Sequence, residues 1–291
     1  MGLLARVKSA FASNRLDVRA RFSLLREAVH GTMSQFYQAR DRETGQIVGL
    51  KILDPEQYQT FENRFRGLDK PPEGQIALQL DHPGVVQTYE HGLTTKNEPY
   101  LVMEYIEGQG LNTLISSGDP LLAARRMLIL CQMAESIAAI HEAGFIHRDI
   151  CPRNFVVSPA GDSVKLIDFG LTVPDTPEFR KPGNRTGTPR YMAPEIVKRR
   201  TTDHRVDIFS FGVSAFELFA GQPPWTGVIT GQDAVIHANQ APADLAELCD
   251  DLDPGVAAAI QSCLAVDPAG RPQKMRDFLA QIDAVGKQMS C

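Results

Sequence analysis

Two carboxylic acids and an amide lie close together near the middle of the chain. Asp149 precedes Asn154 by five residues, and Asp168 follows after a short apolar run. Carboxylate and amide oxygens are hard ligands of the kind that Mg²⁺ prefers, so Asn154 and Asp168 are candidate metal ligands. Asp149 is a candidate acceptor for the proton of a hydroxyl group. These residue types predict the transfer of a phosphate group from a metal-bound donor.

The two segments that carry these residues resemble loops of the protein kinases. His147-Arg148-Asp149-Ile150-Cys151-Pro152-Arg153-Asn154 is similar to the catalytic loop, H-R-D-x-x-x-x-N, and Asp168-Phe169-Gly170 is similar to the metal loop, D-F-G. The resemblance covers residues 22–285 and identifies a eukaryotic-like Ser/Thr protein kinase of the kind also found in bacteria. It implies that ATP and Mg²⁺ are the cofactors and that Asp149 accepts the proton of a Ser or Thr hydroxyl.

The fold that this resemblance implies is an α+β, bilobal protein kinase-like fold. A small antiparallel β lobe is expected over residues 21–105, and a larger, mainly helical lobe over residues 106–291, so that a single kinase domain spans 21–286. Residues 1–20 are expected to form a basic leader. Membrane contact through this leader is one hypothesis, and a loosely packed leader is the alternative.

Composition excludes several other classes of protein. The net charge of −5 gives no support for nucleic-acid binding. No charge-free apolar run reaches the length of a membrane span. The five cysteines are scattered and form no C-x-x-C pair, which argues against a disulfide framework or a zinc site and favours the cytoplasm.

Alternating apolar residues predict strands in the first part of the chain. The expected strands are 22–25, 35–39 and 47–53. Kinases carry the phosphate-covering loop G-x-G-x-x-G between the first two strands, and here the three glycine positions hold Val29, Gly31 and Ser34. Two of the three glycines are therefore replaced, which restricts the backbone of a tight loop.

Lys51 resembles the lysine that holds the α- and β-phosphates, because Val48-Gly49-Leu50-Lys51 is similar to V-A-I-K. Its acidic partner is expected on the next helix, where Glu62 and Glu73 are the two candidates. Counting back from His82-Pro83 favours Glu73, and Glu62 is then expected to be a solvated charge.

The segment 99–108 resembles the last strand of the small lobe and the hinge that meets adenine. The resemblance places backbone groups near Glu104 and Ile106 against adenine, with Met103 behind it. Val156, in the apolar run after the catalytic loop, completes the expected nucleotide site.

Helical periodicity predicts a long helix over 121–143 that ends before Gly144. Further on, Asp207 begins a segment similar to the buried central helix of the large lobe and is expected to brace the catalytic-loop backbone. Arg271 lies in a family motif and is expected to pair with Glu195.

The segment 168–195, here called the activation segment, ends in Gly187-Thr188-Pro189-Arg190-Tyr191-Met192-Ala193-Pro194-Glu195, which resembles Ser/Thr kinases. The resemblance implies that Thr188 hydrogen-bonds Asp149. Thr176 and Thr186 are candidate regulatory phosphosites, because Arg148 offers a cation to a phosphate; ordinary surface threonines are the alternative.

The catalytic loop departs from the family pattern at one position. Ser/Thr kinases place a lysine two residues after the catalytic aspartate, where this chain has Cys151. Arg153 stands where many tyrosine kinases have an arginine, and its guanidinium is predicted to supply the missing charge. An Arg153 that points to solvent is the alternative.

Two other functions remain open. A pseudokinase, a nucleotide-binding scaffold, is suggested by the replaced loop glycines, and a small-molecule phosphotransferase shares the catalytic Asp and Asn. The expected partners are a Ser/Thr protein substrate and ATP, with the chain a monomer or a transient dimer.

Overall fold

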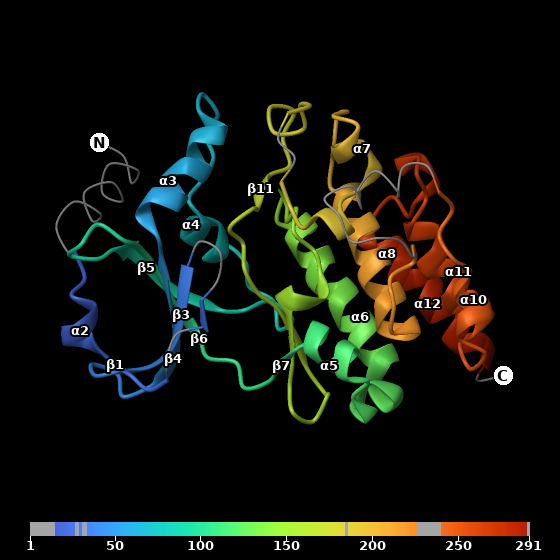
Figure 1. Ribbon diagram of the computed structural model, residues 1–291, viewed down its shortest axis with the longest axis horizontal. Helices are drawn as coiled ribbons and strands as arrows, with labels where there is room; N and C mark the ends of the chain where they lie inside the picture. Colours follow the sequence, from blue (N-terminus) through green and yellow to red (C-terminus); the bar gives the residue numbers. More distant parts are fainter. Residues whose placement is uncertain (1–14, 27–28, 31–33, 184–185, 226–239, 290–291) are drawn as a thin grey trace. The chain divides into compact units, whose positions relative to one another are not determined.

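The structure is a computed structural model that describes residues 15–26, 29–30, 34–183, 186–225 and 240–289. Contacts divide the chain into two compact units. The first contains Met1–Gln79 and Val86–Ile106, and the second contains Leu80–Val85 and Glu107–Cys291. The expected α+β kinase fold is confirmed, with an antiparallel sheet in the first unit and a mainly helical second unit (Figure 1).

The short segment Leu80–Val85 belongs to the second unit, although the sequence placed it in the small lobe. Its backbone explains this membership. Val85 forms a parallel bridge with Leu166, and the Gly84 carbonyl accepts hydrogen bonds from Leu166 N (2.8 Å) and Ser136 Oγ (2.8 Å). These bonds, one of them from a side chain, tie the segment to elements of the second unit.

One antiparallel sheet forms the centre of the first unit. Its strand order is β1-β3-β4-β6-β5, with β2 also paired to β3. The strands are β1 (Phe22–Leu24), β2 (Val29–His30), β3 (Ser34–Asp41), β4 (Ile47–Leu53), β5 (Thr88–Leu93) and β6 (Pro99–Glu104). Alternate residues of neighbouring strands form one apolar cluster, which includes Phe22, Ala39, Val48 and Val102.

Short helices accompany this sheet. They are α2 (Val18–Arg21), α3 (Pro55–Glu62), the 3₁₀ turn η1 (Asn63–Phe65) and α4 (Glu73–Ala77). Asp17 caps α2, and Leu16 forms a bridge to Thr94 of the loop after β5. The end of the predicted leader is therefore part of the first unit; residues 1–14 lie outside the described residues.

Packed helices form most of the second unit. The longer ones are α5 (Leu111–Ser117), α6 (Pro120–Glu142), α8 (Arg205–Ala220), α11 (Pro254–Cys263) and α12 (Met275–Met289). Shorter ones are η2 (Pro152–Asn154), η3 (Pro189–Tyr191), α7 (Pro194–Val197), α10 (Leu245–Leu248) and η4 (Pro268–Gly270). Figure 1 shows α6, α8, α11 and α12 side by side in this unit.

The helix α8 is almost entirely buried, and its buried residues run without a break from Val206 to Phe219. A Cβ atom at Gly212 would come within 2.7 Å of the Cys263 side chain, so glycine permits the close approach of α8 and α11. On another face, Phe211 meets Phe278 edge to face at 4.9 Å. This helix is the rigid support on which the catalytic loop is built.

Short strands frame the loops of the second unit. A three-stranded sheet has the order β10-β9-β7, and a two-stranded sheet pairs β11 with β8. Their bounds are β7 (Gln109–Gly110), β8 (Phe145–Ile146), β9 (Phe155–Val157), β10 (Val164–Leu166) and β11 (Val173–Pro174). Among the described residues, no helix is both long enough and apolar enough to cross a membrane.

Candidate active site

The catalytic loop is held by a buried carboxylate at the start of α8. Asp207 accepts hydrogen bonds from the backbone N–H groups of His147 (2.8 Å) and Arg148 (2.8 Å), and its Oδ2 also lies 3.0 Å from His141 Nε2. Burial alone would raise the pKa of Asp207, but the His141 hydrogen bond and the neighbouring charges bring it below its ordinary value. The predicted bracing contact is present, and His141 extends it to α6.

This brace holds a strained backbone. Arg148 has a φ of +67°, a left-handed conformation that is uncommon for a residue with a side chain. Its guanidinium Nη2 donates to the Phe179 carbonyl (2.5 Å). The Arg148 side chain therefore donates a hydrogen bond to the activation-segment backbone, while its backbone N–H donates to Asp207.

Asp149 lies in a ring of hydrogen-bond donors. Its Oδ1 accepts from the backbone N–H (2.9 Å) and the Oγ1 (2.6 Å) of Thr188. Its Oδ2 accepts from Arg153 Nη2 (2.9 Å) and Asn154 Nδ2 (3.1 Å). These bonds fix the carboxylate in one orientation, which is what a proton acceptor in a positioned reaction needs.

Arg153 and Cys151 differ sharply in their surroundings. The Arg153 side chain is 55% exposed, and its Nη2 also donates to Thr188 Oγ1 (2.8 Å). Cys151 is buried, and burial raises the pKa of its thiol to about 12. The thiol is neutral at physiological pH, so Cys151 supplies no positive charge here, whereas the Arg153 guanidinium contacts the Asp149 carboxylate.

Hairpin pairing brings the two candidate metal ligands together. Phe155 of β9 pairs with Leu166 of β10, and the ladder continues as Ile167 N donates to the Asn154 carbonyl (2.8 Å). Asp168, one residue further on, has a φ of +69°, and its Oδ1 accepts from Gly170 N (3.2 Å). Asn154 directly precedes β9, and Asp168 comes two residues after the end of β10. The two candidate ligands therefore lie at the same end of the hairpin.

The donor set fits Mg²⁺ bound through phosphates. Asn154 Nδ2 donates to the Asp149 carbonyl (2.7 Å), which orients the amide so that its oxygen faces away from Asp149. In the described part of the chain, no three His, Cys, Asp or Glu side chains cluster to hold a metal ion. Mg²⁺ usually takes one or two protein carboxylates and completes its shell with other oxygens, from phosphates and water. Asp168 would supply a carboxylate, and Asn154 would add an amide oxygen.

In the first unit, Lys51 meets one of its two predicted partners. Lys51 Nζ lies 2.6 Å from Glu73 Oε1, and both side chains are buried. Glu73 begins α4, directly after Pro72, where the helix dipole favours a negative charge. A Cβ atom at Gly74 would overlap the His91 ring at 2.4 Å, so glycine lets α4 approach β5 closely.

Glu62 is not the solvated charge that the sequence predicted. Its Oε1 lies 2.9 Å from Lys70 Nζ, whose side chain is only 2% exposed. The Lys70 ammonium also lies over the rings of Phe61 (5.6 Å) and Phe65 (5.5 Å). Two aromatic rings bury the lysine, and Glu62 supplies the counter-charge that a buried ammonium requires.

The remaining residues of the predicted nucleotide site fall in different parts of the chain. Met103 is buried in β6, and Glu104 Oε1 accepts from Gln87 N (2.7 Å), while Ile106 follows the strand. Val29 lies in β2 and Ser34 begins β3. Gly31 lies outside the described residues, and Val156 lies in β9 of the second unit.

The candidate phosphosites differ in access. Thr186 is buried, with 4% of its surface exposed, so a protein kinase cannot reach its hydroxyl in this conformation. Thr176 is partly exposed and donates to Glu178 Oε2 (2.7 Å). Arg148, the expected partner of a phosphate, is already bonded to the Phe179 carbonyl.

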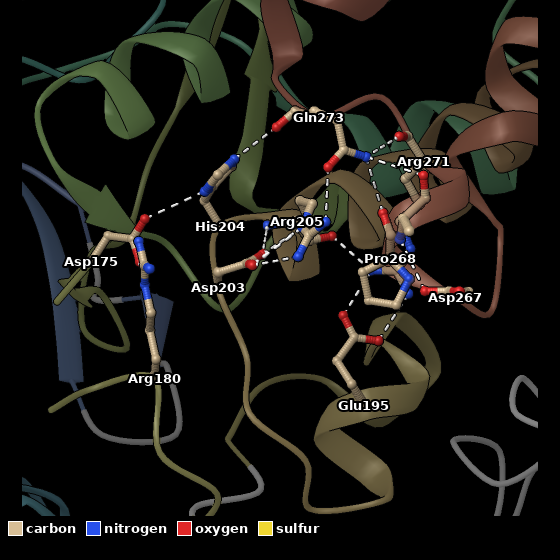
Figure 2. Close-up of polar contacts among 11 residues, drawn as sticks. Asp175, Arg180, Glu195, Asp203, His204, Arg205, Asp267, Pro268, Arg271 and Gln273 are labelled. Carbon is tan, nitrogen blue, oxygen red and sulfur yellow. Dashed lines mark hydrogen bonds and ion pairs between the residues drawn. The ribbon is translucent and has the colours of Figure 1, made fainter. Parts of the chain in front are cut away.

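A buried ion pair closes the activation segment. Arg271 donates from Nη1 and Nη2 to the two oxygens of Glu195, at 2.7 Å and 2.8 Å. The predicted pairing is therefore present, in the bidentate geometry that arginine and carboxylate favour (Figure 2).

Sequence reasoning missed a second polar group in this region, formed by Asp175, Arg180 and His204. These residues match no motif, and no local spacing links Asp175 to His204.

Comparison with known proteins agrees with the geometry. A family model described as "Protein kinase domain" matches residues 23–281. The chain is 29% identical to the serine/threonine-protein kinase pkn3 of Myxococcus xanthus, over 89% of this chain and 48% of that protein. It is 30% identical to pkn2 of the same organism, over 96% of this chain and 34% of that protein.

A third relative is the serine/threonine-protein kinase PknA of Mycobacterium tuberculosis. It is 30% identical, over 93% of this chain and 62% of that protein. The chain thus spans between about a third and less than two thirds of the length of these curated relatives.

Proposed function

The chain belongs to the protein kinase domain family, and from this premise we propose that it transfers the γ-phosphate of ATP to Ser or Thr hydroxyls of protein substrates. The observation that carries the proposal is the fixed Asp149 carboxylate, which accepts from Thr188, Arg153 and Asn154. A carboxylate held in this way can receive the hydroxyl proton without rearrangement.

Each charged residue has a separate part in this proposal. Lys51, oriented by its ion pair with Glu73, binds the α- and β-phosphates of ATP. Asn154 and Asp168 would hold Mg²⁺, which would neutralise negative charge on the phosphates of ATP. Arg153 supports the transferring phosphate with a guanidinium, and the buried Cys151 contributes no charge.

Thr188 supports Ser/Thr specificity. Its hydroxyl donates to Asp149 Oδ1 and accepts from Arg153 Nη2, so it links the end of the activation segment to both residues. The relatives described above are named serine/threonine-protein kinases, which favours the same acceptor. We propose a protein substrate for this reason, and a cytoplasmic location because the four described cysteines are free thiols.

Incubation of the purified chain with ATP and Mg²⁺, with and without a generic basic protein, tests this proposal. We expect phosphate on Ser or Thr residues of the substrate and of the chain itself, mapped by mass spectrometry. Asp149→Asn, prepared in parallel, is the control for a contaminating kinase and should give no label. Phosphate found only on tyrosine, or in equal amounts with Asp149→Asn, would refute the proposal.

A pseudokinase scaffold is the second candidate, because Val29 and Ser34 replace two glycines of the phosphate-covering loop. It predicts nucleotide binding without transfer. The presence of Lys51, Asp149, Asn154 and Asp168 together favours the active enzyme, since a scaffold has no need of a positioned proton acceptor.

A further inference from the structure

His204 is placed between two hydrogen-bond acceptors. Its Nδ1 lies 3.3 Å from Asp175 Oδ2, and its Nε2 lies 2.8 Å from the Gln273 carbonyl. Figure 2 shows the imidazole with one contact on each side. A carbonyl oxygen cannot donate, so Nε2 must carry a proton.

The other side of the ring needs a proton as well. Arg180 Nε donates to Asp175 Oδ1 (2.7 Å), so the carboxylate lies between a guanidinium and the imidazole. Burial opposes ionisation of Asp175, but its bonds to His204 and Arg180 hold the pKa well below the ordinary value. An ionised Asp175 accepts only, so its contact with Nδ1 favours a proton on that nitrogen as well. Protons on both nitrogens would make His204 an imidazolium.

Taken together, the groups around the ring stabilise the imidazolium form of His204. Three effects oppose it: His204 is partly buried, it occupies the N-cap position of α8, where the helix dipole is positive, and the His141 ring from α6 lies 5.1 Å away. Asp203 lies next to His204 and favours the charge, although Arg205 binds it at 2.7 Å. The hydrogen bond to Asp175 is the largest contribution, and it raises the pKa of His204 despite partial burial.

One acceptor, Asp175, lies near the start of the activation segment, and the other, the Gln273 carbonyl, lies outside the segment beside Arg271, which holds its end. Asp175 follows β11, and its N–H donates to the Gly144 carbonyl (2.8 Å), just before β8 leads into the catalytic loop. Gln273 Nε2 donates to the Arg271 carbonyl (2.7 Å), and Arg271 holds Glu195 at the far end of the segment. His204 thus connects the start of the segment to the residues that secure its end.

We propose that the His204 imidazolium is a positioning residue, which ties the start of the activation segment to the support of its end and keeps the segment in the arrangement needed for phosphate transfer. We call Asp175, His204 and the Gln273 carbonyl the histidine clamp. The inference rests on the proposed kinase function for its effect on catalysis, while the charge on His204 is inferred from the contacts of its ring and does not depend on catalysis.

The pH dependence has a definite sign. The folded pKa of His204 is raised above the ordinary value of 6.5 by Asp175. The clamp is complete below about pH 6.5 and is lost as the pH rises through the folded pKa. A neutral imidazole has a single N–H and can serve only one of the two acceptors.

Imidazole ¹H–¹⁵N spectra of the 291-residue chain test the charge directly. His204→Gln identifies the His204 signal by its loss. We expect imidazolium shifts on both nitrogens at and below pH 6.5 and a titration midpoint above 6.5, which Asp175→Asn lowers. A neutral imidazole at pH 6.5, or a midpoint that Asp175→Asn leaves unchanged, would overturn the proposal.

Activity profiles test the positioning role. We expect His204→Gln to lower kcat by roughly tenfold to a hundredfold, because one charge-assisted hydrogen bond is lost. His204→Arg keeps a permanent charge, so it should retain activity and lose the decline at high pH. His82→Gln, at a histidine whose Nδ1 accepts from Gly84 N, is the control and should keep that decline.

These two measurements separate the inference from the proposed function. Equal losses in His204→Arg and His204→Gln, with thermal melts showing both variants folded, would refute the role of the charge. A chain that transfers no phosphate but shows the charged, Asp175-dependent His204 would contradict the proposed function and support the clamp's electrostatics.

Discussion

Arg153→Ala is expected to lower kcat for phosphate transfer by about 10²–10³, the usual cost of removing one preorganised donor to developing charge. The expected lysine of the loop is absent, and the buried thiol of Cys151 is neutral. Arg153 is the cation beside Asp149, and its Nη2 is already directed at Asp149 and Thr188. A guanidinium has five N–H donors, so these bonds leave others to meet phosphate oxygens.

Steady-state kinetics on matched variants measure this effect. Cys151→Ala should have a near-normal kcat, because the thiol contributes no charge. Arg153→Lys should fall between wild type and Arg153→Ala, since it keeps the charge but loses the planar fork. Thermal melts check that each variant is folded. A normal kcat in Arg153→Ala would mean that the loop replaces the missing lysine in another way.

Arg271→Ala is expected to lower the free energy of unfolding by about 3–5 kcal/mol, because it leaves the Glu195 carboxylate buried without its partner. The Arg271 side chain is 0% exposed. It also donates to the carbonyls of Ala265 and Arg205, and its guanidinium lies over the Phe209 ring at 5.0 Å. The substitution therefore removes several contacts of a charged group that water cannot replace.

An exposed pair of the same chemistry provides the control. Arg276 makes a two-bond contact with Glu142, at 2.7 Å and 3.0 Å, with both side chains about half exposed. Arg276→Ala should cost about 1 kcal/mol or less. Urea unfolding followed by the fluorescence of Trp225, the single tryptophan, reports on this unit, since Trp225 stacks on Phe209. Equal losses in the two variants would contradict the account of the buried pair.

Local patterns predicted the elements that carry the site. Alternation located β4 at Ile47–Leu53, and helical periodicity located α6, which ends before Gly144 with its φ of +83°. Counting back from His82-Pro83 favoured Glu73 over Glu62, and Glu73 is the acid that meets Lys51. These signals depend on residues close in the sequence, where sterics and hydrogen bonding act directly.

The features that sequence reasoning did not predict depend on contacts between residues that the fold brings together. Glu62 pairs with Lys70, whose ammonium is buried by two aromatic rings. The position of Glu62 on a helix does not reveal this partner. Thr186 lies in a Thr-rich loop, yet the fold buries it. Asp175 directly follows β11, which pairs with β8, and His204 directly precedes α8, so the fold brings together two residues that are 29 positions apart in the sequence. No spacing in the sequence encodes these contacts.

Nucleotide binding and phosphate transfer, measured on the same sample of the full chain, test the central claim most directly. The sample is titrated with ATP and Mg²⁺, and then incubated with γ-labelled ATP and a basic protein. The account predicts both saturable binding and Mg²⁺-dependent incorporation of label into Ser or Thr residues. Saturable binding with no incorporation of label into either protein would contradict it and identify a nucleotide-binding scaffold.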